Sequence, residues 1–151
     1  MYESLRDFIL KFDNLEKLEL IGLSLVDHLH EMVTAIKRPK LKHLSLPLNG
    51  IEQEYCQYFN YMFSFETLES LNLSSNWFGQ QGLKRFKGQF SKFTNLKALN
   101  ISNSRLCLGP DVKEVSECLS ACATNITDLS IMENSIKDQD MIEFLAPVIG
   151  G

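Results

Sequence analysis

The stretch 15–20 reads LEKLEL, and its pattern returns four more times along the 151-residue chain. The later copies are LKHLSL at 41–46, LESLNL at 68–73, LKALNI at 96–101 and ITDLSI at 126–131. A unit that recurs every 26 to 30 residues is typical of a solenoid, in which each repeat packs against its neighbours. The repeats therefore predict an extended array with a long exposed surface.

Each copy alternates apolar and polar residues as L-x-x-L-x-L, with another apolar residue at the eleventh position. This alternation predicts one short strand per repeat with one face buried, and the strands should stack in parallel. Helical apolar spacing follows each strand, as in 27–38 and 52–63, and we expect Asp27 to cap the first of these helices. An apolar stripe from Leu5 to Phe12 predicts the helix of an incomplete preceding repeat.

The ninth position of three repeats is asparagine, at Asn49, Asn76 and Asn134, whereas repeats one and four carry Leu23 and Ser104 there. With these motifs the chain resembles the leucine-rich repeat family, in which the ninth side chain bonds the backbone of neighbouring turns. The resemblance implies a curved α/β horseshoe of about five repeats plus a partial N-terminal one. Parallel strands would line its concave face and helices its convex face. Where Asn is replaced, we expect an incomplete asparagine ladder and less regular turns.

The repeat length, together with a helix in each repeat, resembles the ribonuclease-inhibitor-like subclass of that family. We expect residues 1–151 to form a single leucine-rich repeat domain. The incomplete repeats at its two ends suggest a fragment of a longer repeat protein or ends covered by partners. A small complete protein with helical caps is the alternative.

The composition argues against several classes of function. A net charge of -4 gives no electrostatic reason to bind nucleic acid or an anionic membrane. No apolar run is long enough to span a bilayer, and residues 1–14 lack the features of a signal peptide, so we expect an intracellular protein. The four cysteines lack the spacing of a disulfide framework. We interpret Cys118 and Cys122 as buried thiols rather than half of a metal site.

No motif for phosphate binding or for an activated nucleophile occurs in the chain. His28 and His30 are two residues apart on a predicted helix, so their side chains diverge and cannot hold one metal ion together. We therefore expect no enzymatic activity, no catalytic residue, no cofactor and no metal site.

The residues between the motif leucines should point outward from the strands, onto the concave face. Near its centre these residues are small and polar, which leaves room for a partner to approach the strands. A simpler interpretation is that these serines and asparagines only keep the face soluble. Trp77, in a loop after the third strand, either marks a docking surface or packs under its turn. The candidate contact residues are His43, Asn72, Ser74, Asn100, Ser102, Asn103, Met132 and Trp77.

Glu16, Lys42, Glu69 and Lys97 occupy the second position of successive repeats. Neighbouring strands lie about 5 Å apart, so opposite charges should pair along this row. We interpret the row as a contribution to solubility and register, because exposed pairs contribute only about 0–1 kcal/mol each.

Together these features predict a non-enzymatic module that binds a protein partner through the concave strand face and adjacent loops. The alternative is a structural subunit of a larger assembly, which would contact its neighbours through its ends and convex helices. The sequence does not identify the partner.

Overall fold

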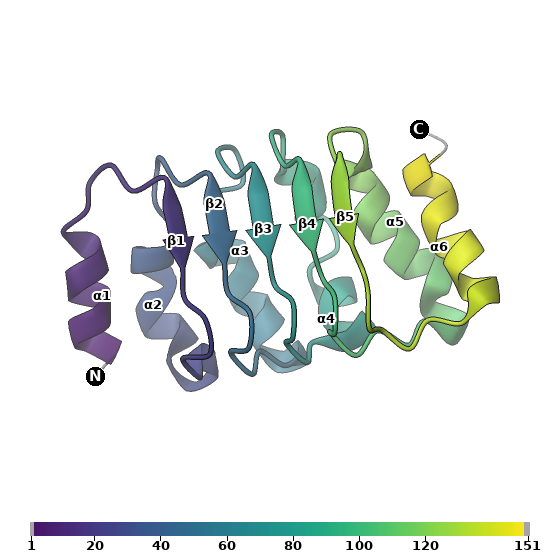
Figure 1. Cartoon of the computed structure of the whole chain (residues 1–151), viewed down its shortest axis with the longest axis horizontal. Helices are drawn as coiled ribbons and strands as arrows, with labels where there is room; N and C mark the ends of the chain where they lie inside the picture. Colours follow the sequence, from purple (N-terminus) through teal and green to yellow (C-terminus); the bar gives the residue numbers. More distant parts are fainter. Residues whose placement is uncertain (1, 150–151) are drawn as a thin grey trace.

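The computed structural model describes residues 2–149, with side chains described from 4 to 146. Its centre is one parallel five-stranded sheet in which strand order follows chain order (Figure 1). The strands are β1 (Lys17–Glu19), β2 (His43–Ser45), β3 (Ser70–Asn72), β4 (Ala98–Asn100) and β5 (Asp128–Ser130). Neighbouring strands pair in the register of the sequence repeat, so that Leu18, Leu44, Leu71, Leu99 and Leu129 align across the sheet. The predicted strands and their stacking are confirmed.

Helices cover one face of the sheet and leave the other uncovered, with α1 and α6 at the two ends (Figure 1). We call the uncovered side the open face; it corresponds to the concave side expected from the sequence. The α-helices are α1 (Tyr2–Leu10), α2 (Leu29–Ile36), α3 (Phe59–Met62), α4 (Gly79–Arg85), α5 (Val112–Ala123) and α6 (Asp138–Ile149). The 3₁₀ segments are η1 (Leu25–His28), η2 (Gln53–Tyr58), η3 (Phe90–Lys92) and η4 (Gly109–Asp111).

In each repeat, the segment that leads from the end of one strand to the start of the next is called here the return segment. The return segments of the first three repeats are less helical than their apolar spacing predicts. The segment expected as one helix over 52–63 is mostly 3₁₀, with only Phe59–Met62 forming an α-helix. The expected cap at Asp27 is wrong, because this residue lies inside η1 and α2 follows directly from that 3₁₀ turn. A 3₁₀ turn leading into a helix continues the backbone hydrogen-bond series, so the helix does not begin at a side-chain cap.

The core lies between the sheet and the helices. The motif residues of repeats two to four are at most 3% exposed, from Leu41 through Ile101. An aromatic cluster fills the space behind β2 to β4, with ring centroids 4.7 to 6.2 Å apart. Its members are Phe59, Phe63, Phe65, Phe86, Phe90 and Phe93. These bulky side chains supply the apolar contacts that longer helices would otherwise make.

The asparagines at position nine join each repeat to the one before it. Oδ1 of Asn76 accepts hydrogen bonds from the backbone amides of Asn49 and Ile51, each at 3.1 Å. Its Nδ2 donates to the carbonyls of Leu46 and Leu73, each at 2.9 Å. Ser104 makes no such bonds to repeat three among the described residues: its shorter side chain donates only to the carbonyl of Ser102 in its own repeat. The ladder is thus interrupted at repeat four, as expected.

Candidate protein-binding surface

Strand geometry places the third and fifth positions of each repeat on the open face, because side chains alternate between the two faces of a strand. The backbone pairings align the third positions Lys17, His43, Ser70, Ala98 and Asp128 in one row, and the fifth positions Glu19, Ser45, Asn72, Asn100 and Ser130 in another. The open face is therefore two parallel rows of side chains running across the strands.

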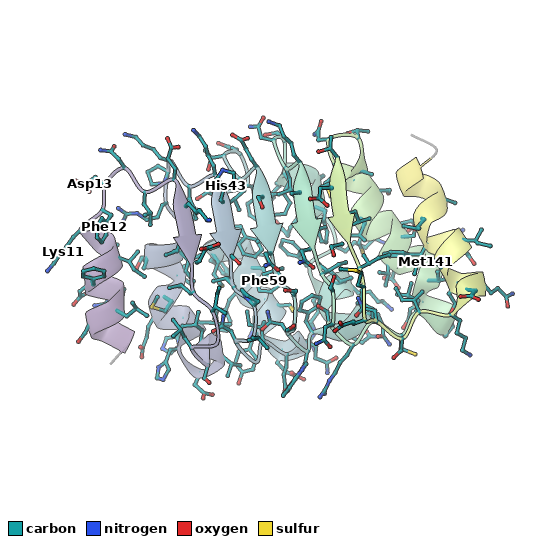
Figure 2. The ribbon with its side chains drawn as sticks, in the orientation of Figure 1. Lys11, Phe12, Asp13, His43, Phe59 and Met141 are labelled. Atoms are coloured by element: carbon teal, nitrogen blue, oxygen red, sulfur yellow. The ribbon has the colours of Figure 1, made fainter. Side chains whose placement is uncertain are left out.

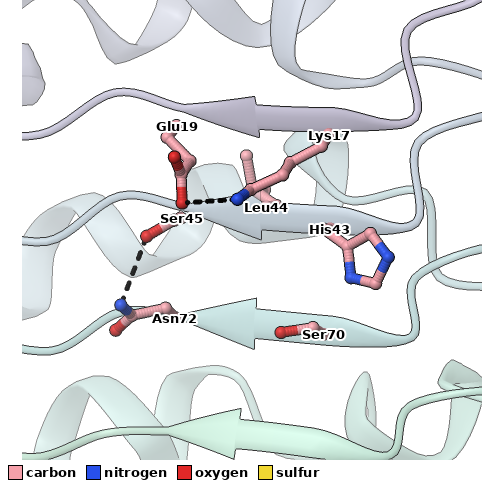
Figure 3. A pocket seen from close by; sticks show the side chains of 7 residues that line it. All are labelled: Lys17, Glu19, His43, Leu44, Ser45, Ser70 and Asn72. Atoms are coloured by element: carbon pink, nitrogen blue, oxygen red, sulfur yellow. Dashed lines mark hydrogen bonds and ion pairs between the residues drawn. The ribbon is translucent and has the colours of Figure 1, made fainter.

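These rows form two adjoining open hollows of about 350 Å³ each. The first lies over β1 to β3, where His43 projects beside Ser70 (Figure 3). The second lies over β3 to β5 and shares Ser70 and Asn72 with the first. The two hollows thus make one continuous shallow trough across the sheet.

Charges differ between the two ends of this trough. Lys17 and Glu19 form an ion pair of 3.2 Å on β1, with His43 exposed on the next strand. Asp128 lies exposed at the β5 end. The residues between them are uncharged, so a partner crossing the trough would meet charged groups at its ends and small polar groups at its centre.

Hydrogen bonds along the row of fifth positions hold the polar centre of the trough in place. Asn72 donates from Nδ2 to Oγ of Ser45 at 3.2 Å, and its Oδ1 accepts from the amide of Ser74 at 3.0 Å (Figure 3). Asn100 accepts from the amide of Ser102 in the same way, at 3.0 Å. These asparagines therefore terminate their strands as well as lining the trough.

The eight predicted contact residues divide into two groups. His43, Asn72 and Asn100 line the trough, with His43 on the strand side of the molecule (Figure 2). The other residues come after the strands, on the edge formed by the strand-to-helix loops at the bottom of Figure 1, which we call the loop edge. This second group is Ser74, Ser102, Asn103, Met132 and Trp77.

Within the second group, burial separates contact candidates from structural residues. Ser102 is buried, and its hydroxyl oxygen lies 2.9 Å from that of Ser130. Met132 is 69% exposed. Trp77 is half exposed, and the guanidinium of Arg105 lies 4.3 Å from its ring centroid. Trp77 is therefore held by a cation–π contact at the loop edge rather than buried beneath the turn.

The candidate contact residues chosen from the sequence leave out several residues of this surface. Ser70 and Ala98 form the floor of the trough, where their small side chains give it depth. Ile21 and Leu48 are the two most exposed apolar residues at the N-terminal part of the loop edge. Both pairs occupy positions that the repeat alignment places outward, but only the backbone conformation of the loop shows how far the apolar side chains protrude.

The row of alternating charge lies at the opposite ends of the strands. Lys42 bonds Glu16 at 3.1 Å and Lys97 bonds Glu69 at 3.2 Å, which confirms the expected pairing. The side-chain hydrogen bond from Lys97 is the largest of the influences that lower the pKa of Glu69. These pairs lie outside the trough and strengthen the lateral register of the strands.

Burial makes three of the four thiols unreactive. It raises the pKa of Cys56 to about 12 and those of Cys118 and Cys122 to about 11. Cys107 is exposed. No group of three or more metal-ligating side chains occurs within the described part of the chain, and none of the helices described there is long and apolar enough to cross a membrane.

Comparison with known proteins agrees with this architecture. The family model described as Leucine Rich repeat matches residues 66–86, which include all of β3 and α4. The chain has the fold of a leucine-rich repeat solenoid. No curated protein sequence matches it.

Two solved structures share the fold of this leucine-rich repeat solenoid. Leiomodin-1 actin-binding site 2 superposes with a TM-score of 0.72 at 14% identity, over 99% of this chain and 90% of that one. The C-terminal domain of tropomodulin from Caenorhabditis elegans superposes with a TM-score of 0.68 at 15% identity, over 97% of this chain and 90% of that one. At such low identity the similarity concerns the fold.

Proposed function

We propose that this leucine-rich repeat solenoid is a non-enzymatic, intracellular module that binds a protein partner through its open face and loop edge. The observation that carries the proposal is the continuous trough, which no helix covers and whose polar side chains are already ordered by hydrogen bonds. A surface that is ordered before binding loses little conformational entropy when a partner docks. The ribonuclease-inhibitor-like subclass remains part of this proposal, supported by the repeat length and by the twelve-residue helices α5 and α6.

Actin is the first partner to test. One structure with the same fold over nearly the whole chain is described as an actin-binding site of leiomodin-1. Purified monomeric actin offers a defined probe, and sedimentation or fluorescence titration would measure its affinity for the solenoid. Absence of binding would remove actin as the partner and leave the proposed surface to be tested with other proteins.

Ala98→Arg is the sharpest substitution for testing the open face. Ala98 lies in the floor of the second hollow, so arginine would fill the trough without removing a side-chain hydrogen bond. Arginine at Asn72 or Asn100 would be less informative, because each asparagine also accepts a backbone amide bond at the end of its strand. Tyr61→Arg provides a matched control, since Tyr61 is exposed on α3, on the helix-covered side.

The experiment is affinity capture from the native cell with mass spectrometry, using wild type, Ala98→Arg and Tyr61→Arg in parallel. We expect a partner that is retained by wild type and Tyr61→Arg but lost with Ala98→Arg. The same partners with all three baits would contradict binding at the trough, provided that circular dichroism shows each variant to be folded.

A structural role within an assembly is the second candidate. Phe8 and Phe12 are exposed at the N-terminal end, where Phe12 is labelled in Figure 2. At the other end, Leu129 and Ile131 are only partly buried, unlike the equivalent residues of the interior repeats. Apolar surface at both ends would favour contacts with neighbouring subunits. Partners that are still captured by the Ala98→Arg variant but are lost with the Phe8→Ser/Phe12→Ser variant would support this role instead.

A further inference from the structure

Leu48 combines an unfavourable backbone conformation with an exposed apolar side chain. Its φ angle is +59°, in the left-handed region, and its side chain is 59% exposed. The same position of the other repeats is also left-handed, but it carries Gly22, Ser75, Asn103 and Glu133. Glycine and asparagine tolerate this conformation well, whereas a bulky residue is an outlier there. Folding alone therefore gives no reason for leucine at this position.

Leu48 belongs to a small apolar patch at the start of the loop edge. Its neighbour in repeat one is Gly22. A Cβ atom on Gly22 would lie 4.0 Å from the Cβ of Leu48. On either side of Gly22 are Ile21, which is 52% exposed, and Leu23, which is also exposed. We call Ile21, Leu23 and Leu48 the rim patch. Because Gly22 has no side chain, the space beside Leu48 is open, and a partner side chain could insert there.

Two exposed acidic residues follow the rim patch along the chain, with Asp27 four residues after Leu23 and Glu52 four residues after Leu48. Asp27 follows Val26, and the Cγ1 of Val26 is 3.7 Å from the position of a Cβ on Gly50. Glu52 comes two residues after Gly50, so the two carboxylates lie on adjacent repeats. Both are exposed, and neither forms an ion pair within the described residues. This part of the loop edge is thus apolar at its centre and negative beside it.

We propose that the rim patch binds a protein segment that inserts an apolar side chain beside Leu48 and places Lys or Arg against Asp27 and Glu52. This inference rests on the proposed function and names the chemistry of the partner. The apolar contact explains why leucine occupies a left-handed position, since conformational strain retained at a surface commonly accompanies binding. The two unpaired carboxylates select basic residues and exclude acidic ones.

The test is selection of a phage-displayed library of random twelve-residue peptides on the wild-type solenoid, followed by fluorescence polarisation with the selected peptides. We expect enrichment of sequences that combine Leu, Ile or Phe with Lys or Arg. Leu48→Asn should weaken their binding by about tenfold or more, as for the central contact of an interface. Asp27→Asn/Glu52→Gln should weaken it less and reduce its dependence on salt.

Two controls separate binding from folding. Leu48→Asn should leave the melting temperature unchanged or raise it by about 2–4 °C, because asparagine suits the left-handed conformation better. Ile142→Gln removes a comparable exposed apolar side chain from α6 and should not affect peptide binding.

The outcomes distinguish the rim patch from the trough. Peptides that lack basic residues, that bind Leu48→Asn as tightly as wild type, or that fail to enrich would overturn the inference. Peptides lost with Ala98→Arg but not with Leu48→Asn would support the open face while excluding the rim patch. Peptides that are insensitive to both substitutions would contradict the inference and the proposed function together.

Discussion

At the scale of single residues, the asparagine ladder explains which repeats carry asparagine at position nine. Each such side chain accepts amides of the preceding repeat, as Asn49 does from Leu23 and Leu25. Repeat one has no described strand before it, so leucine at its ninth position interrupts no ladder. Among the described strands, Leu23 therefore leaves no pair of neighbouring repeats without its asparagine bonds, which the family pattern alone could not show.

The ladder also predicts a position-dependent loss of stability. Asn76→Ala would leave two buried amides and two buried carbonyls without partners. An unsatisfied buried group costs about 1–3 kcal/mol, and with partial relaxation we expect a loss of roughly 3–4 kcal/mol in the free energy of unfolding. Asn134→Ala, at a half-exposed site, should cost about half as much because water can replace its bonds. Equal losses by urea denaturation would contradict this account.

The thiols give a second prediction at this scale. At neutral pH the raised pKa values keep Cys56, Cys118 and Cys122 protonated as well as buried. Because the thiolate is the reactive form, Ellman's reagent should titrate one fast thiol in the native protein, at Cys107, and four after denaturation. Cys107→Ser should abolish the fast phase. A second fast thiol in that variant would show that the core opens locally.

At the scale of single elements, α4 depends on the absence of a side chain at Gly82. A Cβ there would lie 2.6 Å from that of Phe78 and 2.8 Å from Sγ of Cys56. Alanine improves helix propensity by about 1 kcal/mol, but overpacking costs about 1–3 kcal/mol, so we expect Gly82→Ala to destabilise the fold by roughly 1–2 kcal/mol. Gln81→Ala, on the exposed side of the same helix, should change stability by less than about 0.5 kcal/mol. A stabilised Gly82→Ala would show that the packing relaxes around the new methyl group.

The elements also show what the sequence could and could not predict. The strands were predictable because the L-x-x-L-x-L phrase specifies both their position and their register. The return segments were less so, since apolar spacing alone does not distinguish a helix over 52–63 from η2 followed by α3. A 3₁₀ segment rises about 2.0 Å per residue against 1.5 Å for an α-helix, so tertiary packing around the Phe cluster decides between them. The rows of the trough were predictable because they follow from the alternation and register of the strands. The protrusion of Leu48 was not, because it depends on the φ angle of that residue.

At the scale of the whole molecule, stability should fall from the central repeats towards β5. In a repeat array each unit is stabilised mainly by its two neighbours. Leu73 donates its amide to Asn100 and Ser75 donates to Ser102. The equivalent amides of Ile131 and Glu133 have no acceptor within residues 2–149. The last repeat therefore has one lateral contact where the interior repeats have two.

Native-state hydrogen exchange measures this difference directly. We expect the amides of Leu73 and Ser75 to exchange at least about a hundredfold more slowly than those of Ile131 and Glu133, because exchange from the interior requires a larger opening. Protection of Ile131 and Glu133 comparable to that of the interior would mean that the β5 edge is covered in solution. If that protection disappeared on dilution, another molecule would be pairing with the edge, as the assembly role requires. If it persisted, the cover would come from the same chain, and Ala98→Arg would remain the deciding test between the trough and the ends.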